Sequence, residues 1–347
     1  MKSWGQAPGL PPNPRSFERE DMQRSIFKRV RLSEISTPLV FVVAIFVFSV
    51  FSPGHRFLDL RNLGSMAKLT PDMGVVTLGI GILMICGEFD LSIASVLPFC
   101  SFIFTQTLIL GINPFLGLVL TIISGAIFGL INGVIVVKTR LPSFIITLST
   151  MMFWRGLLYG ISHMMPISIN NYLAENRVFE QFMVGQIGSV PVQIIWLLVF
   201  AVILGLMLHR TWFGNWIYAT GSNEDAARAM GVNVELVKTV CYMIVGMLCA
   251  WAAIMQSVRL GSFAATQGIG FELKSIAAVV VGGTTLTGGV GSMLGIFLGL
   301  FIIQILENGL ILMQVPVFGV EVFIGAAVIL FVILNNYANR QAIRQGA

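Results

Sequence analysis

Hydrophobic residues form long, nearly unbroken runs along most of the chain, and short polar stretches separate these runs. A membrane-spanning helix needs about 17–25 predominantly apolar residues. By that length we expect ten spans, at residues 36–53, 72–87, 91–110, 114–137, 142–162, 191–208, 238–258, 275–290, 292–313 and 317–336. The stretch Phe57–Lys68 also carries Asp59 and Arg61, so it is predicted to be a separate interfacial helix.

The composition agrees with an all-α, polytopic integral membrane protein. Of the 347 residues, 56% are hydrophobic and 11% are charged, and the mean hydropathy is +0.87. In soluble domains about a quarter of the residues are charged. We divide the chain into a tail at 1–35, a transmembrane domain at 36–337 with a polar loop at 209–237, and a second tail at 338–347. The four cysteines lie inside apolar runs, which predicts buried thiols without metal or disulfide.

Basic residues are distributed unevenly between the connections of this topology. If the N-terminus is cytoplasmic, the tails and loops on the cytoplasmic side carry 14 Lys and Arg and those on the other side carry six. Cytoplasmic loops of membrane proteins have an excess of Lys and Arg. The bias predicts that both termini are cytoplasmic. It also explains the net charge of +5 without a nucleic-acid partner.

Two glycine-containing stretches interrupt the apolar runs where a helix should continue. They are Gly87–Ser92 and Gly282–Thr287, and both follow a Gly-x-x-x-Leu-[Ser/Thr] pattern. Irregular backbone is tolerated in a membrane only where protein or a polar cavity surrounds it, and broken helices are typical of transporter paths. We therefore expect two broken or re-entrant helices around a central path, with their unwound main chain at mid-bilayer depth. The alternative is that the glycines only allow close helix packing.

Two carboxylates lie in the first of these stretches. Glu88 and Asp90 are flanked by apolar sequence, where an ionisable side chain is costly and usually faces a cavity or a partner. Asp90 can contact a substrate, or it can cap the helix that follows by accepting backbone N–H bonds. The sequence leaves both roles open.

The polar loop contains a short helix signal between Gly221 and Asn233. Ser222 begins a capping-box-like pattern, acidic residues fill the first turn, and Gly231 suits a left-handed stop. A helix of about two turns is too short to be stable alone, so it must dock. Either another subunit or its own domain receives it. The candidate docking residues are Ser222, Asn223, Glu224, Ala226, Ala227 and Gly231.

Several chemical functions lack their motifs in this sequence. No phosphate loop of the form G-x-x-x-x-G-K-[ST] and no H-E-x-x-H pattern occur, so we expect neither ATP binding by this chain nor metal catalysis, and no cofactor. Few titratable residues are predicted at mid-membrane depth. An ion-driven carrier would bury more of them, which indicates that energy comes from elsewhere.

The same motifs carry a family resemblance. Residues 87–95 (GEFDLSIAS) resemble the G-G-I-D-L-S-V-G-S motif of permease subunits in bacterial ribose-type ABC importers, a group that takes up monosaccharides and autoinducer-2-like solutes. Residues 221–233 are similar to their G-x-N-x-x-A-A-x-x-x-G-I-N segment, and residues 271–289 to their Y-E-L-x-A-I-A-A-V-V-L-G-G-T-S-L-x-G-G segment. Asn308-Gly309-Leu310 matches a further element. Glu88 and Ala94 replace glycines, and Thr285 replaces a common serine.

The resemblance implies a division of labour. Two permease chains would form the path for a monosaccharide or polyol across the inner membrane, ATP-binding subunits would dock on the cytoplasmic helix Ser222–Gly231, and a periplasmic binding protein would deliver the substrate. The expected pathway residues are Glu88, Asp90, Ser92, Ser95, Thr284, Thr285, Thr287, Asn132 and Asn308. Two other hypotheses are a stand-alone, ion-coupled secondary transporter and a structural membrane subunit without a path.

Overall fold

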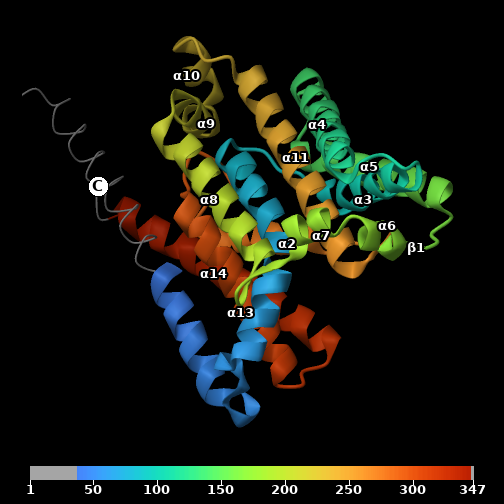
Figure 1. Cartoon of the computed structure of the whole chain (residues 1–347). Coiled ribbons are helices and arrows are strands. Elements are labelled where there is room, and N and C mark those ends of the chain that lie inside the picture. Colours follow the sequence, from blue (N-terminus) through green and yellow to red (C-terminus); the bar gives the residue numbers. More distant parts are fainter. Residues whose placement is uncertain (1–36, 345–347) are drawn as a thin grey trace, which may run out of the picture.

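The computed structural model describes residues 37–344, and most of them are helical (Figure 1). The helices are Thr37–Phe51, η1 (Pro53–Leu58), α2 (Leu60–Ile85), α3 (Ile93–Ile109), α4 (Pro114–Thr139), α5 (Ser143–Ser162), α6 (Asn170–Glu175), α7 (Arg177–Val184), α8 (Val192–Arg210), α9 (Trp212–Ser222), α10 (Glu224–Ala229), α11 (Val234–Leu260), α12 (Phe271–Val281), α13 (Met293–Leu312) and α14 (Val317–Arg344). Two tiny antiparallel pairs join β1 (Ile167–Ser168) to β4 (Ser262–Phe263) and β2 (Gln186–Ile187) to β3 (Val190–Pro191).

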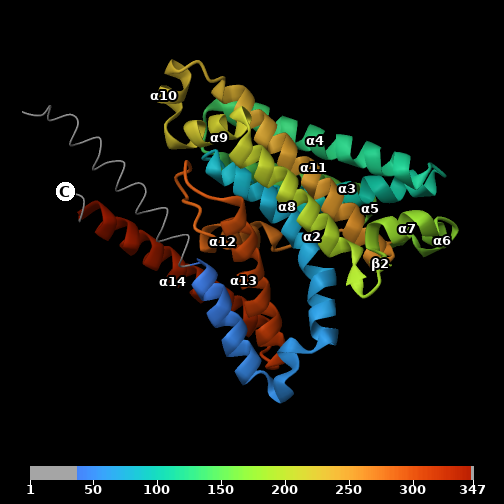
Figure 2. The ribbon, with the colours of Figure 1, turned by 60° about the vertical axis from the view of Figure 1, so that its left-hand side comes forward.

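Helix α2 is the central element of the molecule. It packs against α11 and α8 and also against α12 and α13 (Figure 2). Every residue from Thr70 to Ile85 is buried. A helix that is apolar all round belongs in the interior of a large protein, and α2 takes that place.

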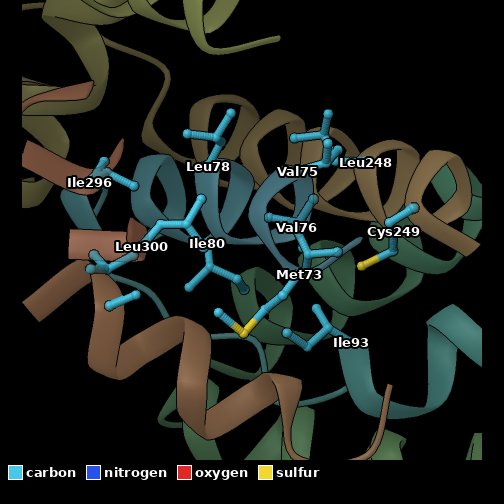
Figure 3. Packing of buried hydrophobic residues seen from close by; sticks show 14 of the residues in the cluster. Met73, Val75, Val76, Leu78, Ile80, Ile93, Leu248, Cys249, Ile296 and Leu300 are labelled. Carbon is cyan, nitrogen blue, oxygen red and sulfur yellow. The ribbon is translucent and has the colours of Figure 1, made fainter. Parts of the chain in front are cut away.

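The core around α2 is a close fit of aliphatic side chains. Figure 3 shows Leu248 and Cys249 of α11 beside one part of α2, and Ile296 and Leu300 of α13 beside another. Because side chains from both helices meet on α2, its position fixes how the two halves of the bundle face each other. All four cysteines are buried and unpaired, as predicted.

Helices α4 and α11 approach each other at the level of their backbones. A Cβ atom placed on Gly129 of α4 would lie 2.1 Å from the carbonyl oxygen of Tyr242 on α11, and one on Gly125 would lie 2.2 Å from that of Gly246. Small residues at such contacts let membrane helices pack tightly. The seam therefore depends on the absence of side chains at these positions.

Six described helices are long and apolar enough to cross a membrane: α2, α4, α5, α8, α11 and α13. Three further apolar helices are shorter, at Thr37–Phe51, Ile93–Ile109 and Phe318–Leu330. The chain is a multi-pass, all-α membrane protein, and most of the predicted spans coincide with helices. The number of ten crossings is not confirmed. The predicted tail at 1–35 lies outside the described residues, and α14 continues to Arg344 through most of the predicted second tail.

The predicted interfacial helix at Phe57–Lys68 is wrong as a separate element. Residues from Leu60 onward form the first turns of α2, which continues through Pro71 to Ile85. Asp59 caps this helix by accepting a hydrogen bond from the Arg61 amide at 3.0 Å. The charges that suggested an interfacial helix thus belong to the start of one long helix.

The predicted span at 275–290 is also wrong. Helix α12 has 11 residues and ends at Val281, so at 1.5 Å per residue it is about 16 Å long. That is roughly half of a ~30 Å hydrocarbon layer. The chain from Gly282 to Ser292 is irregular before α13 begins. The expectation of broken helices at 87–92 and 282–287 is confirmed, because neither stretch is helical.

We predict that Gly129→Leu destabilises the protein by about 1–3 kcal/mol or more, because the new side chain meets the α11 backbone. The measurement is the apparent Tm of the purified protein in detergent. Gly156→Leu in α5 is the control, since a Cβ there has no neighbour within 4 Å. A Gly129→Leu protein that unfolds at the wild-type temperature would contradict the close backbone contact between α4 and α11.

Candidate functional site

The first irregular segment, Cys86–Ser92, is held by side chains of neighbouring helices. The Phe89 amide donates to Ser143 Oγ of α5 at 3.1 Å, and the Leu91 amide donates to Thr147 Oγ1 of the same helix at 3.1 Å. Tyr242 of α11, which is fully buried, donates its hydroxyl to the Phe89 carbonyl at 2.9 Å. Backbone groups away from water need such partners. Gly87 makes the turn after α2 with φ +91°, a conformation unfavourable for other residues.

The second irregular segment, Gly282–Ser292, is supported by a different set of helices. Tyr218 of α9 donates to the Gly291 carbonyl at 2.7 Å, and the Met293 amide donates to His209 Nε2 of α8 at 3.3 Å. Within the segment, Thr285 Oγ1 donates to the Gly288 carbonyl at 2.8 Å. The segment is thereby tied to the α8–α9 corner.

The two irregular segments are in direct contact. The Gly289 amide donates to the Ile85 carbonyl, the last residue of α2, at 2.8 Å. A Cβ on Gly288 would lie 2.7 Å from the Cα of Gly87, and a Cβ on Gly221 at the end of α9 would lie 2.6 Å from the Gly289 amide nitrogen. Three backbones therefore meet at one point: both broken segments and the end of α9.

This junction lies at the end of the bundle that carries α9 and α10, rather than half-way along it (Figure 2). The expected depth in the middle of the bundle is corrected here. The physical reason is the early start of α2: from Leu60 to Ile85 its 26 residues extend about 39 Å, enough to cross a bilayer before the break.

An ammonium group connects the first segment to α10. Lys238 of α11 lies 2.5 Å from Glu88 Oε1, and it also pairs with Glu224 at the start of α10. The Lys238 and Glu88 side chains are 10% and 8% exposed, so this pair is largely removed from water. One cation is thus shared by a carboxylate of the broken segment and a carboxylate of the short helix.

A cavity of about 510 Å³ with charged and apolar lining residues opens beside these groups. Its charged lining consists of Glu88, Glu224, Glu235, Arg140, Arg228 and Lys238. The three carboxylates and three cations leave no formal net charge. The cavity therefore offers hydrogen-bonding groups and balanced ion pairs at the α10 end of the molecule.

Helix α10 is built largely as the sequence predicts. Asn223, not Ser222, is its cap: Asn223 Oδ1 accepts from the Ala226 amide at 2.9 Å, while Ser222 is the last residue of α9. Gly231 follows the helix with φ +84°, as expected for a left-handed stop. Arg228 pairs with Glu235 at 2.7 Å, and this hydrogen bond raises the pKa of the guanidinium, which stays charged.

The two faces of α10 differ in their exposure to solvent. Ala227 is fully buried against its own chain, and Glu224 is tied to Lys238. Asp225, Ala226, Ala229 and Met230 are exposed, with the Met230 side chain 71% accessible. An exposed large apolar side chain next to an exposed small-residue surface is suited to contact with another protein.

Four predicted pathway residues, from the first broken segment, α3 and α4, are buried and hydrogen-bonded. Asp90 accepts from the Ser92 amide at 2.8 Å and from Ser92 Oγ at 2.6 Å, and Asn132 Nδ2 donates to Ser92 Oγ at 2.7 Å. Ser95 donates to the Met151 carbonyl at 2.8 Å. Asp90 therefore has the capping geometry that the sequence allowed, and these four side chains are buried inside one chain.

The remaining predicted residues are distributed over two places. Thr284 is buried, Thr285 is half-buried and Thr287 is exposed, all in the second broken segment. Asn308 of α13 lies elsewhere, in a reciprocal amide pair with Asn62 of α2 at 2.9 and 3.0 Å. The structure thus joins Glu88 and Thr284–Thr287 at the junction and separates Asn308 from it. Within residues 37–344, no cluster of three metal-ligating side chains occurs.

Comparison with known proteins agrees with this architecture. The family described as "Branched-chain amino acid transport system / permease component" matches residues 62–333. The chain belongs to this permease family. It is 33% identical to the ribose import permease protein RbsC of Escherichia coli K12 over 90% of this chain and 96% of that protein. It is 36% identical to RbsC of Bacillus subtilis 168 over 84% and 89%, and 30% identical to the xylose/arabinose import permease protein XylH of Sulfolobus acidocaldarius over 92% and 89%.

Sequence reasoning missed the residues that support the junction of this permease. Lys238, Tyr242, Ser143 and Thr147 were treated as span residues, although they hold the first broken segment. A signal for Lys238 existed: it begins a predicted span and needs an anion at that depth. The hydroxyl groups gave no such signal, because Ser and Thr are frequent in all membrane helices.

We predict that Lys238→Met destabilises the permease by about 3–5 kcal/mol, because it leaves the buried Glu88 carboxylate without its cation. The double variant Glu88→Gln/Lys238→Met should recover most of this loss. Apparent Tm values of the three proteins provide the measurement. Arg228→Met is the control, since its exposed pairs contribute only about 0–1 kcal/mol. Equal effects at both positions would argue against a special role of Lys238.

Proposed function

We propose that this chain is the permease subunit of an ATP-binding cassette importer for a monosaccharide or related polyol in the bacterial inner membrane. The observation that carries the proposal is the contact chain from α10 to the broken segments. Lys238 bridges Glu224 of α10 and Glu88 of the first segment, and Gly289 of the second segment hydrogen-bonds to the end of α2. A push on α10 thus reaches both irregular segments through short contacts.

The substrate class rests on the relatives. The E. coli and B. subtilis proteins are named as permeases for ribose, and the S. acidocaldarius protein for xylose and arabinose. Their matches cover most of both chains. The family description names branched-chain amino acids, a different class of solute. Three sugar permeases aligned nearly end to end favour the sugar class for this chain.

The proposed assembly contains two permease chains, identical or different, embedded in membrane lipid, two ATP-binding subunits and a periplasmic binding protein. The exposed face of α10, with Ala226, Ala229 and Met230, is the proposed docking surface for the ATP-binding subunit. We propose that α10 and both termini face the cytoplasm, as the bias of Lys and Arg predicts. In this arrangement the permease hydrolyses nothing itself.

The buried network of Asp90, Ser92, Ser95 and Asn132 has a proposed role as the rigid anchor of α3, next to the path rather than in contact with solute. Glu88 and the threonines at 284, 285 and 287 remain the proposed groups along the inner part of the path. Weak, exchangeable hydrogen bonds suit a permease because tight binding slows release.

An ATP-dependence experiment tests the proposal against a secondary transporter. The permease is reconstituted in liposomes with its ATP-binding subunit and binding protein, and uptake of radiolabelled ribose and xylose is followed. We expect uptake with ATP and both partners, and none with a proton or sodium gradient alone. Gradient-driven uptake by the chain without an ATPase would falsify the importer proposal and support the secondary transporter.

We predict that Met230→Asp lowers ATP-dependent sugar uptake at least about tenfold, equivalent to ~1.4 kcal/mol of docking energy. The side chain is exposed, so the variant should insert and unfold like the wild type. Met230→Leu keeps the apolar contact and should keep uptake. Normal uptake by Met230→Asp would remove this face of α10 from the docking surface.

A further inference from the structure

A second cavity with charged and apolar lining residues lies far from the junction, beside the middle of α2 and the last turns of α11. It has a volume of about 260 Å³ and is lined by residues of α2, α11, α12 and α13. Gln256 of α11 lines it, whereas Lys238 of the same helix lines the first cavity. At 1.5 Å per residue these two positions are about 27 Å apart, close to the ~30 Å thickness of a hydrocarbon layer.

Two ion pairs cross this cavity between helices. Arg259 of α11 donates to Asp72 Oδ2 of α2 from Nη2 at 2.5 Å and from Nε at 3.1 Å. Lys274 of α12 lies 2.7 Å from Glu307 of α13. Each cation has its own carboxylate, so the cavity has no formal net charge. It is therefore matched to a neutral solute rather than to an anion or a cation.

Two residues that line this cavity each carry a buried hydrogen-bond acceptor without a partner among residues 37–344. These acceptors are Asp72 Oδ1, on a side chain with 3% exposure, and Gln256 Oε1. A buried acceptor without a donor costs about 1–3 kcal/mol. A ligand with several hydroxyl donors removes that cost at both atoms. Phe271, at the first turn of α12, adds an aromatic ring beside them.

We propose that this cavity is an outer subsite that accepts a neutral polyol of monosaccharide size from the far side of the membrane. The inference rests on the proposed import function and adds its entry site. Sugar hydroxyls would donate to Asp72 and Gln256, and the Phe271 ring would contact C–H groups. The volume is slightly below the range of about 300–1,000 Å³ for drug-sized ligands, which fits a small solute.

The location of the subsite also indicates the direction of solute movement. The middle of helix α2 lies beside this subsite with Met66, Asp72 and Met73, and the helix ends just before Gly87 and Glu88, which line the first cavity. Helix α11 connects the same two places in the opposite direction. The outer subsite therefore lies on the side of the bundle away from α10.

The test measures protection of an introduced thiol. Met66→Cys places a cysteine in the lining of the subsite, and the four native cysteines are buried. The rate of maleimide labelling is measured for the complete transporter in nanodiscs, with and without D-ribose or D-xylose. A sugar concentration four times Kd slows labelling about fivefold, because the free fraction falls as 1/(1 + [L]/Kd).

Ser65→Cys is the matched control, because Ser65 is exposed next to Met66 but does not line the cavity. Its labelling rate should not respond to sugar. Adding Gln256→Leu to Met66→Cys should abolish protection and leave the rate without sugar unchanged. The Gln256→Leu variant separates loss of ligand contact from a change in folding. A change in folding would alter the labelling rate both with and without sugar.

Three results would overturn the subsite. They are equal labelling with and without sugar, protection by L-leucine in place of the sugars, and protection that survives Gln256→Leu. The same transporter is also reconstituted in liposomes and assayed for ATP-dependent sugar uptake. This second assay separates the subsite proposal from the import proposal. Uptake without protection refutes the subsite and leaves the import function standing, whereas a transporter without any sugar uptake refutes both.

Discussion

The main-chain N–H and C=O groups of two unwound segments are the constraint on which the structure depends. Many of these groups are buried, and buried N–H and C=O groups need hydrogen-bond partners, which the surrounding helices supply. Ser143, Thr147 and Tyr242 do this for the first segment, and Tyr218 and His209 for the second. The partners come from α5, α8, α9 and α11, and these helices are consequently held in register with both breaks.

Such partners also make the junction movable. Each contact is a single hydrogen bond or ion pair, with a net contribution of about 0.5–1.5 kcal/mol for a neutral hydrogen bond. The aliphatic core around α2 and the backbone seam between α4 and α11 are much harder to rearrange. A partner that binds α10 differently in its ATP-bound and ATP-free states can shift an equilibrium only by that difference in affinity. The junction is the part of the molecule where a free-energy difference of that size is sufficient to rearrange the contacts.

The sequence predicted the helical class, most of the helices, both breaks and the short helix α10, because these follow from apolar length, glycine position and capping residues. It failed where two signals conflicted. The charges between Asp59 and Lys68 suggested a surface helix, yet α2 passes through them and through Pro71, and the depth of the first break was misjudged for this reason. The partners of the broken segments could not be predicted, since Lys238 and Glu88 are 150 positions apart in the sequence and only the fold brings them together. The outer cavity was missed for the same reason: Asp72, Arg259, Lys274 and Glu307 come from four helices.

Hydrogen–deuterium exchange of the complete transporter tests the central claim most directly. Peptides that cover residues 84–94 and 282–293 report on the backbone amides of Phe89, Leu91 and Gly289, which are hydrogen-bonded within the chain. The account predicts that these amides are protected without nucleotide and exchange faster with ATP and vanadate, while peptides from the α4–α11 seam keep their protection. Identical exchange of both segments in the two nucleotide states, in a transporter that hydrolyses ATP and takes up sugar, would contradict it.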